Sequence, residues 1–91
     1  MKTGRDYGKL FQAQLQAQKE KLDENEHKPG FDELTFAYTW KRINNEFEEL
    51  QHECTRSKWD LKKVRREAAD LANFLGMLIL TCDEELEAID D

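Results

Sequence analysis

Two pairs of acidic residues have the types and the spacing needed to hold a divalent cation. Glu46 and Glu49 form the first pair, and Glu67 and Asp70 form the second. Residues three apart in a helix lie on one face, about one turn from each other. Carboxylate oxygens are ligands that Mg²⁺ favours. If the two pairs lie on neighbouring antiparallel helices, four carboxylates meet in one space, and the sequence predicts a magnesium site there.

The apolar residues around these pairs recur in steps of four and three, which is typical of the inward face of a helix. Glu53 continues the first acidic strip by one turn, and Asn73 continues the second. We therefore expect both acidic strips to lie at the margin of a helical core. The first predicted core stripe is Phe36, Trp40, Ile43, Phe47, Leu50 and Cys54, and the second is Leu61, Val64, Ala68, Leu71, Leu75 and Leu78.

The first predicted helix precedes both acidic pairs and runs from about Asp6 to Glu24. Phe11, Leu15 and Leu22 are its large apolar residues, and we expect them to face inward. The segment that follows contains a Pro-Gly pair, which is typical of a helix stop. The acidic pairs are therefore expected on the two later helices.

These two later helices are expected to form an antiparallel hairpin. Asp32 is the predicted N-cap of the second helix, which ends near Cys54. Ser57 and Asp60 have the spacing of a capping box that opens the third helix, which extends to about Cys82. No strand pattern is present. We predict one all-α domain over residues 1–91, with three main helices, a short C-terminal helix and frayed ends at 1–5 and 84–91.

Length and composition predict that the chain associates with copies of itself. The chain has 91 residues, of which 38% are hydrophobic and 37% are charged. A chain of this size buries only about two-thirds of its unfolded surface. Residues 71–80 are apolar nearly all round, so a helix there needs burial on more than one side. The run is too short to cross a bilayer. A dimer or a tetramer is therefore expected.

Charge and cysteine content limit the classes of partner and the location. The net charge of −6 argues against nonspecific binding to nucleic acid, because no basic face dominates. The first residues lack the apolar core of a secretion signal, so a cytoplasmic location is expected. Cys54 and Cys82 are then expected to be free thiols. No membrane association is predicted.

A solvated acidic face is the competing interpretation of the two carboxylate pairs. Asp and Glu account for 20 of the 91 residues, so this spacing arises often without any metal. The metal interpretation depends on both pairs lying next to the predicted core and facing each other across a hairpin. From these residues alone, both interpretations stay open.

Two segments resemble signatures of the MazG-like all-α nucleoside triphosphate pyrophosphohydrolases. Residues 45–50 (NEFEEL) are similar to the E-E-x-x-E-L motif of that family, and residues 66–74 (REAADLANF) are similar to its E-x-A-D-x-x-N-F motif. Residues 21–31 (KLDENEHKPGF) are similar to its K-L-x-x-N-x-x-K-G-W segment. Together the resemblance covers about Lys21 to Ile79. Asn45 departs from the pattern, because many members have a Glu at this position.

The resemblance implies hydrolysis of a ribo- or deoxyribonucleoside triphosphate to the monophosphate and pyrophosphate. It implies Mg²⁺, with Mn²⁺ as a substitute, held by Glu46, Glu49, Glu67 and Asp70. Glu49 would then be catalytic, and Glu53 would orient the attacking water in place of an acid at position 45. The alternative for Glu53 is a solvated face.

The same resemblance implies a set of substrate-binding residues, namely Lys21, Asn25, Lys28 and Asn73. For Lys28 the alternative is solvent exposure. For Asn73 the alternative is a buried polar residue that is satisfied across a subunit interface. Two other functions stay open for the whole chain: a noncatalytic helical interaction module whose segment 71–80 docks a partner, and a sensor that binds nucleotides without hydrolysing them.

Overall fold

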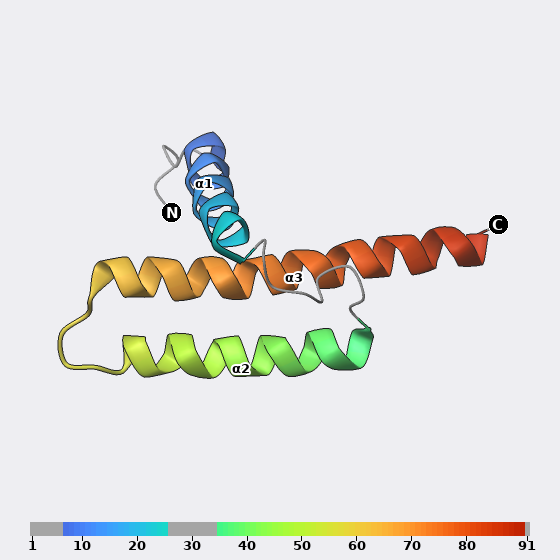
Figure 1. Ribbon diagram of the computed structural model, residues 1–91. Coiled ribbons are helices and arrows are strands. Elements are labelled where there is room, and N and C mark those ends of the chain that lie inside the picture. Colours follow the sequence, from blue (N-terminus) through green and yellow to red (C-terminus); the bar gives the residue numbers. More distant parts are fainter. Residues whose placement is uncertain (1–6, 26–34, 91) are drawn as a thin grey trace.

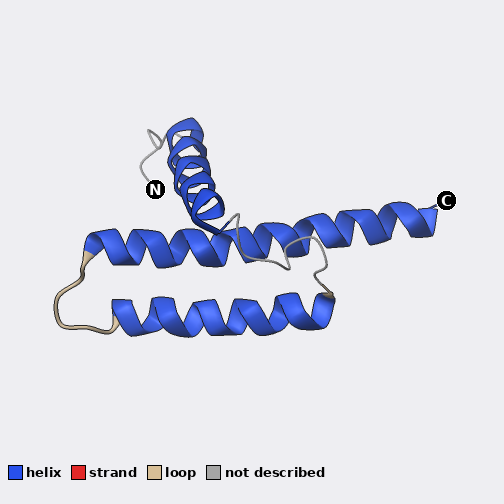
Figure 2. Cartoon of the chain, in the orientation of Figure 1, coloured by secondary structure: helices blue, strands red, loops and turns tan. Residues whose placement is uncertain are grey.

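The computed structural model describes residues 7–25 and 35–90, and the regular structure in these ranges is entirely helical (Figure 2). The helices are α1 (Tyr7–Asn25), α2 (Phe36–Cys54) and α3 (Leu61–Asp90). As predicted, α2 and α3 form an antiparallel hairpin (Figure 1). Helix α1 runs steeply across α3 and makes no contact with α2. Within the described ranges, no helix is long and apolar enough to span a membrane.

Capping side chains set where α2 and α3 begin. The predicted cap Asp32 lies outside the described residues, and α2 is capped by Thr35, whose Oγ1 accepts a hydrogen bond from the Tyr38 backbone N–H at 3.1 Å. The predicted Ser57 capping box is wrong. Asp60 itself is the cap of α3, because its Oδ1 accepts from the Lys63 N–H at 3.3 Å.

The turn between α2 and α3 is closed by Trp59, whose indole Nε1 donates to the Cys54 carbonyl at 2.8 Å. Beyond this turn, α3 is longer than predicted. It continues without interruption to Asp90, so the predicted stop near Cys82, the separate short helix and the fraying of residues 84–90 are wrong. Residues 83–90 contain no Pro or Gly, and Glu, Leu and Ala are good helix formers, so nothing ends the helix there.

The buried face of α2 is rotated by about one position from the predicted stripe. Phe36, Trp40 and Phe47 are 46%, 60% and 52% exposed, so the prediction that they form the core is wrong. The physical reason is that α3 is the one described helix that packs against α2, and the polar strip of α2, rather than its aromatic stripe, faces α3. The residues of α2 that are buried are Thr39, Ile43, Glu46 and Glu53.

Helices α1 and α3 show the same kind of shift. Phe11, Leu15 and Leu22 on α1 are exposed, contrary to prediction. Phe11 and Leu15 lie in the half of α1 that does not reach α3, and Leu22 lies in the half that does but on another face than the buried Ala17 and Lys21. Where α1 meets α3, the small residues Ala17 and Ala69 are buried. On α3 the predicted stripe is exposed or half-buried. The residues of α3 that are buried are Ala69, Asp70, Asn73 and Phe74.

The chain by itself has little apolar core. Among residues 7–25 and 35–90, the buried hydrophobic residues are Ala17, Ile43, Ala69 and Phe74. Its radius of gyration is 15.4 Å, against about 12 Å expected for a compact chain of this length. Its accessible surface is 7541 Å², whereas a compact monomer of this mass exposes about 5,500 Å². Cys54 and Cys82 are free thiols, as predicted. The three helices therefore leave much apolar surface uncovered.

Candidate metal centre

The two acidic pairs meet between α2 and α3. Glu46 and Glu49 project from α2, and Glu67 and Asp70 project from the first half of α3. One carboxylate oxygen from each residue lies within 4.8 Å of the corresponding oxygens of the other three. The sequence prediction that these side chains share one space is confirmed. Their function as metal ligands stays a prediction.

The cluster is more deeply buried than a strip at the margin of a core. Glu46 is 2% exposed and Asp70 is 9% exposed, whereas Glu67 is half-buried and Glu49 is exposed. Oε2 of Glu46 and Oε2 of Glu67 are buried, and neither has a hydrogen-bond partner among the described residues. Buried carboxylate oxygens normally have a partner. Unpaired oxygens from two helices, directed into one group of acids, fit a hard divalent cation.

The electrostatics of the cluster favour a proton where no cation is bound. Burial is the main cause that raises the pKa of Glu46, to about 8, and the carboxyl groups of Asp70 and Glu49 raise it further. The pKa of Glu67 is raised by burial and then by Glu49 and Asp70, against the opposing effect of Lys21. Like charges held this close disfavour the ionised forms of Glu46 and Glu67. A bound cation would reverse this preference.

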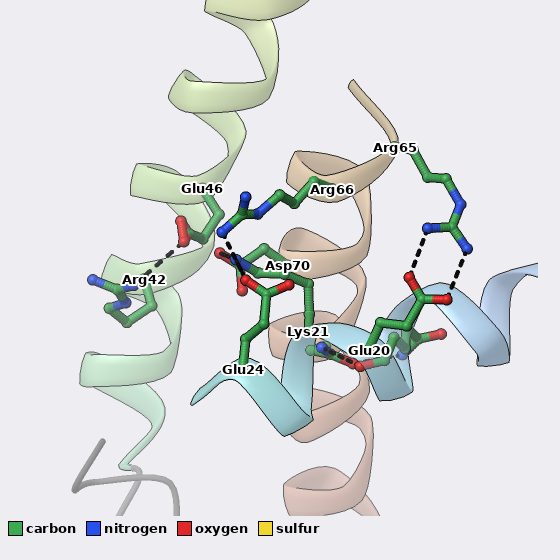
Figure 3. A network of polar contacts seen from close by, with 10 residues as sticks. Glu20, Lys21, Glu24, Arg42, Glu46, Arg65, Arg66 and Asp70 are labelled. Carbon is green, nitrogen blue, oxygen red and sulfur yellow. Dashed lines mark hydrogen bonds and ion pairs between the residues drawn. The ribbon is translucent and has the colours of Figure 1, made fainter. Parts of the chain in front are cut away.

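Arg42 is a site residue that the sequence reasoning missed. Its Nη2 lies 3.3 Å from Oε1 of Glu46, one helical turn away on α2 (Figure 3). Its guanidinium also lies over the ring of Phe74 on α3, 5.1 Å from the ring centroid. The i, i+4 spacing to Glu46 was the available signal. Arg42 therefore holds Oε1 of Glu46, whereas Oε2 is buried and has no hydrogen-bond partner among the described residues.

Lys21 reaches the cluster from α1. Its Nζ lies 3.7 Å from Oδ2 of Asp70 and 3.9 Å from Oε1 of Glu24, and the residue is 9% exposed. Figure 3 shows Lys21 and Asp70 at the crossing of α1 and α3, with Arg66 and Glu24 beside them. Of the predicted substrate-binding residues, Lys21 is therefore next to the acids. Asn25 ends α1, and Lys28 lies outside the described residues.

A pocket of about 590 Å³ opens beside Glu49 and Glu67, and residues of α2 form most of its lining. Asn45, the departure from the family motif, lines this pocket. Glu53 lines it as well and is buried, so the interpretation of Glu53 as a solvated residue is wrong. Its Oε1 accepts from Nη1 of Arg56 at 3.3 Å. The complete lining is Arg42, Asn45, Glu48, Glu49, His52, Glu53 and Glu67.

Asn73 has partners that the sequence reasoning did not anticipate. Its Nδ2 donates to the Gln18 carbonyl at 3.1 Å, and its Oδ1 accepts from Nε2 of Gln18 at 3.0 Å. The amide is thus satisfied within the chain, by α1, rather than across a subunit interface. In this arrangement Asn73 joins α1 to α3. A direct contact between Asn73 and a ligand stays a prediction.

Comparison of the chain with protein-family models, with curated proteins and with solved structures found no match. The resemblance to the MazG-like motifs therefore rests on the quoted residues alone. The geometry adds that the four acids of those motifs lie together, while Lys21 lies beside them.

Proposed function

We propose that this protein is a magnesium-dependent hydrolase that converts a nucleoside triphosphate to the monophosphate and pyrophosphate. The observation that carries the proposal is the convergence of four carboxylate oxygens within 4.8 Å. Two of these residues, Glu46 and Glu67, have a buried oxygen without a partner in the described part of the chain. The motif resemblance supplies the reaction, because the same four acids are the metal ligands that it implies.

Glu46, Glu49, Glu67 and Asp70 would hold the cation. When bound, Mg²⁺ would neutralise phosphate charge and lower the pKa of a bound water, which is the usual contribution of a divalent metal in phosphoryl chemistry. One water is consumed, and the phosphoanhydride bond between the α- and β-phosphates breaks. The nucleoside monophosphate and pyrophosphate leave as products.

The other side chains orient the acids or the attacking water. Arg42 fixes the rotamer of Glu46 through its contact at 3.3 Å. Glu53 lies in the pocket beside Glu49, one turn further along α2, where its carboxylate would accept a proton from the attacking water. Lys21 would place a positive charge between the acids and the incoming phosphates. In this proposal Glu53 orients the attacking water, because Asn45 has no carboxylate to do so.

The deciding experiment is a turnover assay with the purified chain, Mg²⁺ or Mn²⁺, and a panel of ribo- and deoxyribonucleoside triphosphates. Products are identified by chromatography, and a chelator serves as the metal-free reference. We expect monophosphate and pyrophosphate. Glu49→Ala should lower kcat/KM by more than about 100-fold, because even residues that only support metal ligands cost 10- to 100-fold.

The matched control is Glu84→Ala, which removes the same charge from an exposed position far along α3. It should retain wild-type turnover, and circular dichroism should show unchanged helix content in both variants. Turnover that survives in Glu49→Ala combined with Asp70→Ala, or that ignores the chelator, would contradict the proposal. Bound but uncleaved nucleotide would instead indicate a sensor.

We also propose that two copies associate through the C-terminal half of α3. The residues Leu75, Ile79, Cys82, Leu86 and Ile89 follow steps of four and three and are all exposed. This spacing is that of a coiled-coil seam. Only the last turns of α3 extend past the end of α2 (Figure 1), and the seam residues before them are exposed although α2 lies alongside that part of α3. The surface in excess of a compact monomer, about 2,000 Å², is of the size that obligate dimers bury.

Charge favours an antiparallel arrangement of the two α3 helices. Residues 83–87 include four acids, which a parallel pair would place against one another. Ile79→Lys should convert the dimer to a 10.8 kDa monomer in sedimentation at low micromolar concentration. Leu61→Lys, at a position that is 72% exposed and off the seam, should leave the dimer intact. A wild-type protein that sediments as a monomer would contradict this proposal.

The exposed seam also favours the second candidate function, a noncatalytic interaction module. In that case the seam binds its partner regardless of metal, and substitution at Glu46 changes nothing. Saturable Mg²⁺ binding that is lost in Glu46→Gln would count against it.

A further inference from the structure

A second pocket lies on the other side of α3, where α1 crosses it. Its volume is about 300 Å³. Cationic side chains dominate its lining: α3 contributes Lys62, Arg65 and Arg66, and α1 contributes Lys21. Glu20 and Glu24 also line it, so the formal charge of the pocket is +2 in a chain whose net charge is −6. A positive pocket in an acidic protein calls for a negatively charged ligand.

The two arginines are occupied by exchangeable partners. Arg66 Nη2 lies 2.7 Å from Oε1 of Glu24, and Arg65 contacts both carboxylate oxygens of Glu20 at 2.9 and 3.4 Å (Figure 3). All four side chains are between 44% and 58% exposed. Exposed ion pairs of this kind contribute about 0–1 kcal/mol, so a multiply charged anion can displace the glutamates.

Lys21 is the buried cation of this pocket and has unused hydrogen-bond donors. Its contacts with Asp70 and Glu24, at 3.7 and 3.9 Å, are longer than a hydrogen bond. An ammonium group has three donors, and Nζ of Lys21 is not among the fully buried side-chain atoms without a partner, so its donors stay accessible to an anion. Within the described residues, Lys21 has ion-pair partners but no hydrogen-bond acceptor. Phosphate oxygens in the pocket would supply acceptors.

From this arrangement we infer that the pocket between α1 and α3 binds the part of a polyphosphate that the metal centre does not hold. Asp70 connects the two places, since it belongs to the acidic cluster and also contacts Lys21. Arg66 would exchange Glu24 for a phosphate and make the bidentate contact for which a guanidinium is suited. Glu24 then acts as a competitor that the ligand must displace. The inference depends on the proposed function only for the identity of the anion.

The test is calorimetric binding of inorganic pyrophosphate to the full chain, in chelator and at low salt, so that no metal takes part. Arg66→Gln should weaken binding by roughly tenfold, the equivalent of one charge-assisted contact. Glu24→Gln should strengthen it severalfold, because the competing carboxylate is gone. A merely structural ion pair predicts that both variants lower stability and that neither changes the affinity.

Two variants control for net charge. Lys63→Gln removes an exposed cation of α3 that does not line the pocket, and Glu84→Gln removes a distant acid. Both should bind pyrophosphate as the wild type does. The inference is overturned if wild-type protein does not bind pyrophosphate, or if Glu24→Gln and Arg66→Gln bind it equally well. Binding with the expected pattern but without nucleotide turnover would support the pocket and contradict only the proposed function.

Discussion

The two sides of α3 differ in how their charged side chains are arranged. Toward α2, the helix directs Glu67 and Asp70 at two further acids, and the pKa of Glu46 rises to about 8 as a result of burial and like charge. Toward α1, Arg65 and Arg66 face glutamates at ion-pair distance. The first side concentrates one sign of charge, and the second side alternates the signs.

The contacts on the α1 side stabilise the folded chain, whereas the like charges on the α2 side destabilise it. Ion pairs and the amide contacts of Asn73 hold α1 on α3, and both Arg65 and Arg66 have a glutamate partner there. The acids between α2 and α3 oppose folding unless a proton or a cation joins them. The proposed chemistry therefore belongs to the α2 side of α3, and the contacts that attach α1 belong to the other side. Lys21, which lies in the basic pocket and contacts Asp70, connects the two sides.

The largest effect should appear in the pH dependence of metal affinity. A cation must displace the proton that Glu46 holds below its pKa of about 8. Mg²⁺ affinity should therefore rise with pH, by roughly 50-fold between pH 6 and 8 for a single displaced proton. Calorimetry in buffers of different ionisation enthalpy would measure the affinity and the protons released. A Mg²⁺ affinity that does not change between pH 6 and 8 would contradict the contrast drawn between the two sides of α3.

Stability without metal should change in the opposite direction. The raised pKa means that the folded state binds more protons than the unfolded state between pH 4.5, the ordinary value, and about 8. The free energy of unfolding should then fall as pH rises through this window and level off above it. Urea unfolding in chelator would show this. Glu46→Gln, which mimics the protonated acid, should flatten the dependence.

The next effect concerns the attachment of α1. Asn73→Ala removes both amide contacts with Gln18 and should lower the free energy of unfolding by about 1–3 kcal/mol. Hydrogen exchange should show α1 losing protection before α2. Asn44→Ala is the matched control, since that amide bonds the Trp40 carbonyl on an exposed surface. Equal losses of unfolding free energy in both variants would contradict the role of Asn73 in attaching α1 to α3.

The smallest effect is expected at the exposed pair of Arg65 and Glu20. Arg65→Gln should change the free energy of unfolding by less than about 1 kcal/mol, and the change should shrink as salt is added. Urea unfolding at two salt concentrations measures both effects. A loss as large as that of Asn73→Ala would mean that ion pairs, rather than the amide contacts, hold α1.

Local patterns were sufficient to predict the helices and the meeting of the acids. The spacing of Glu46 to Glu49 and of Glu67 to Asp70, together with a turn near residue 57, implied a hairpin with the acids facing each other, and the structure confirms it. The inward faces were predicted incorrectly because hydrophobic periodicity identifies the most apolar face of a helix. Which face is buried depends instead on where the neighbouring helix lies. Trp40 and Phe47 belong to that apolar face and are 60% and 52% exposed, because no other described helix packs against that face.

The sequence by itself determined three helical segments and two carboxylate pairs at helical spacing, because propensity, capping and periodicity act over a few residues. Only the tertiary structure decided that α1 crosses α3 rather than joining the hairpin, that Lys21 reaches Asp70, and that Arg65 and Arg66 face Glu20 and Glu24. These contacts join residues more than 40 positions apart. They depend on the angle and depth at which two helices meet, and the small residues Ala17 and Ala69 at the crossing set that approach.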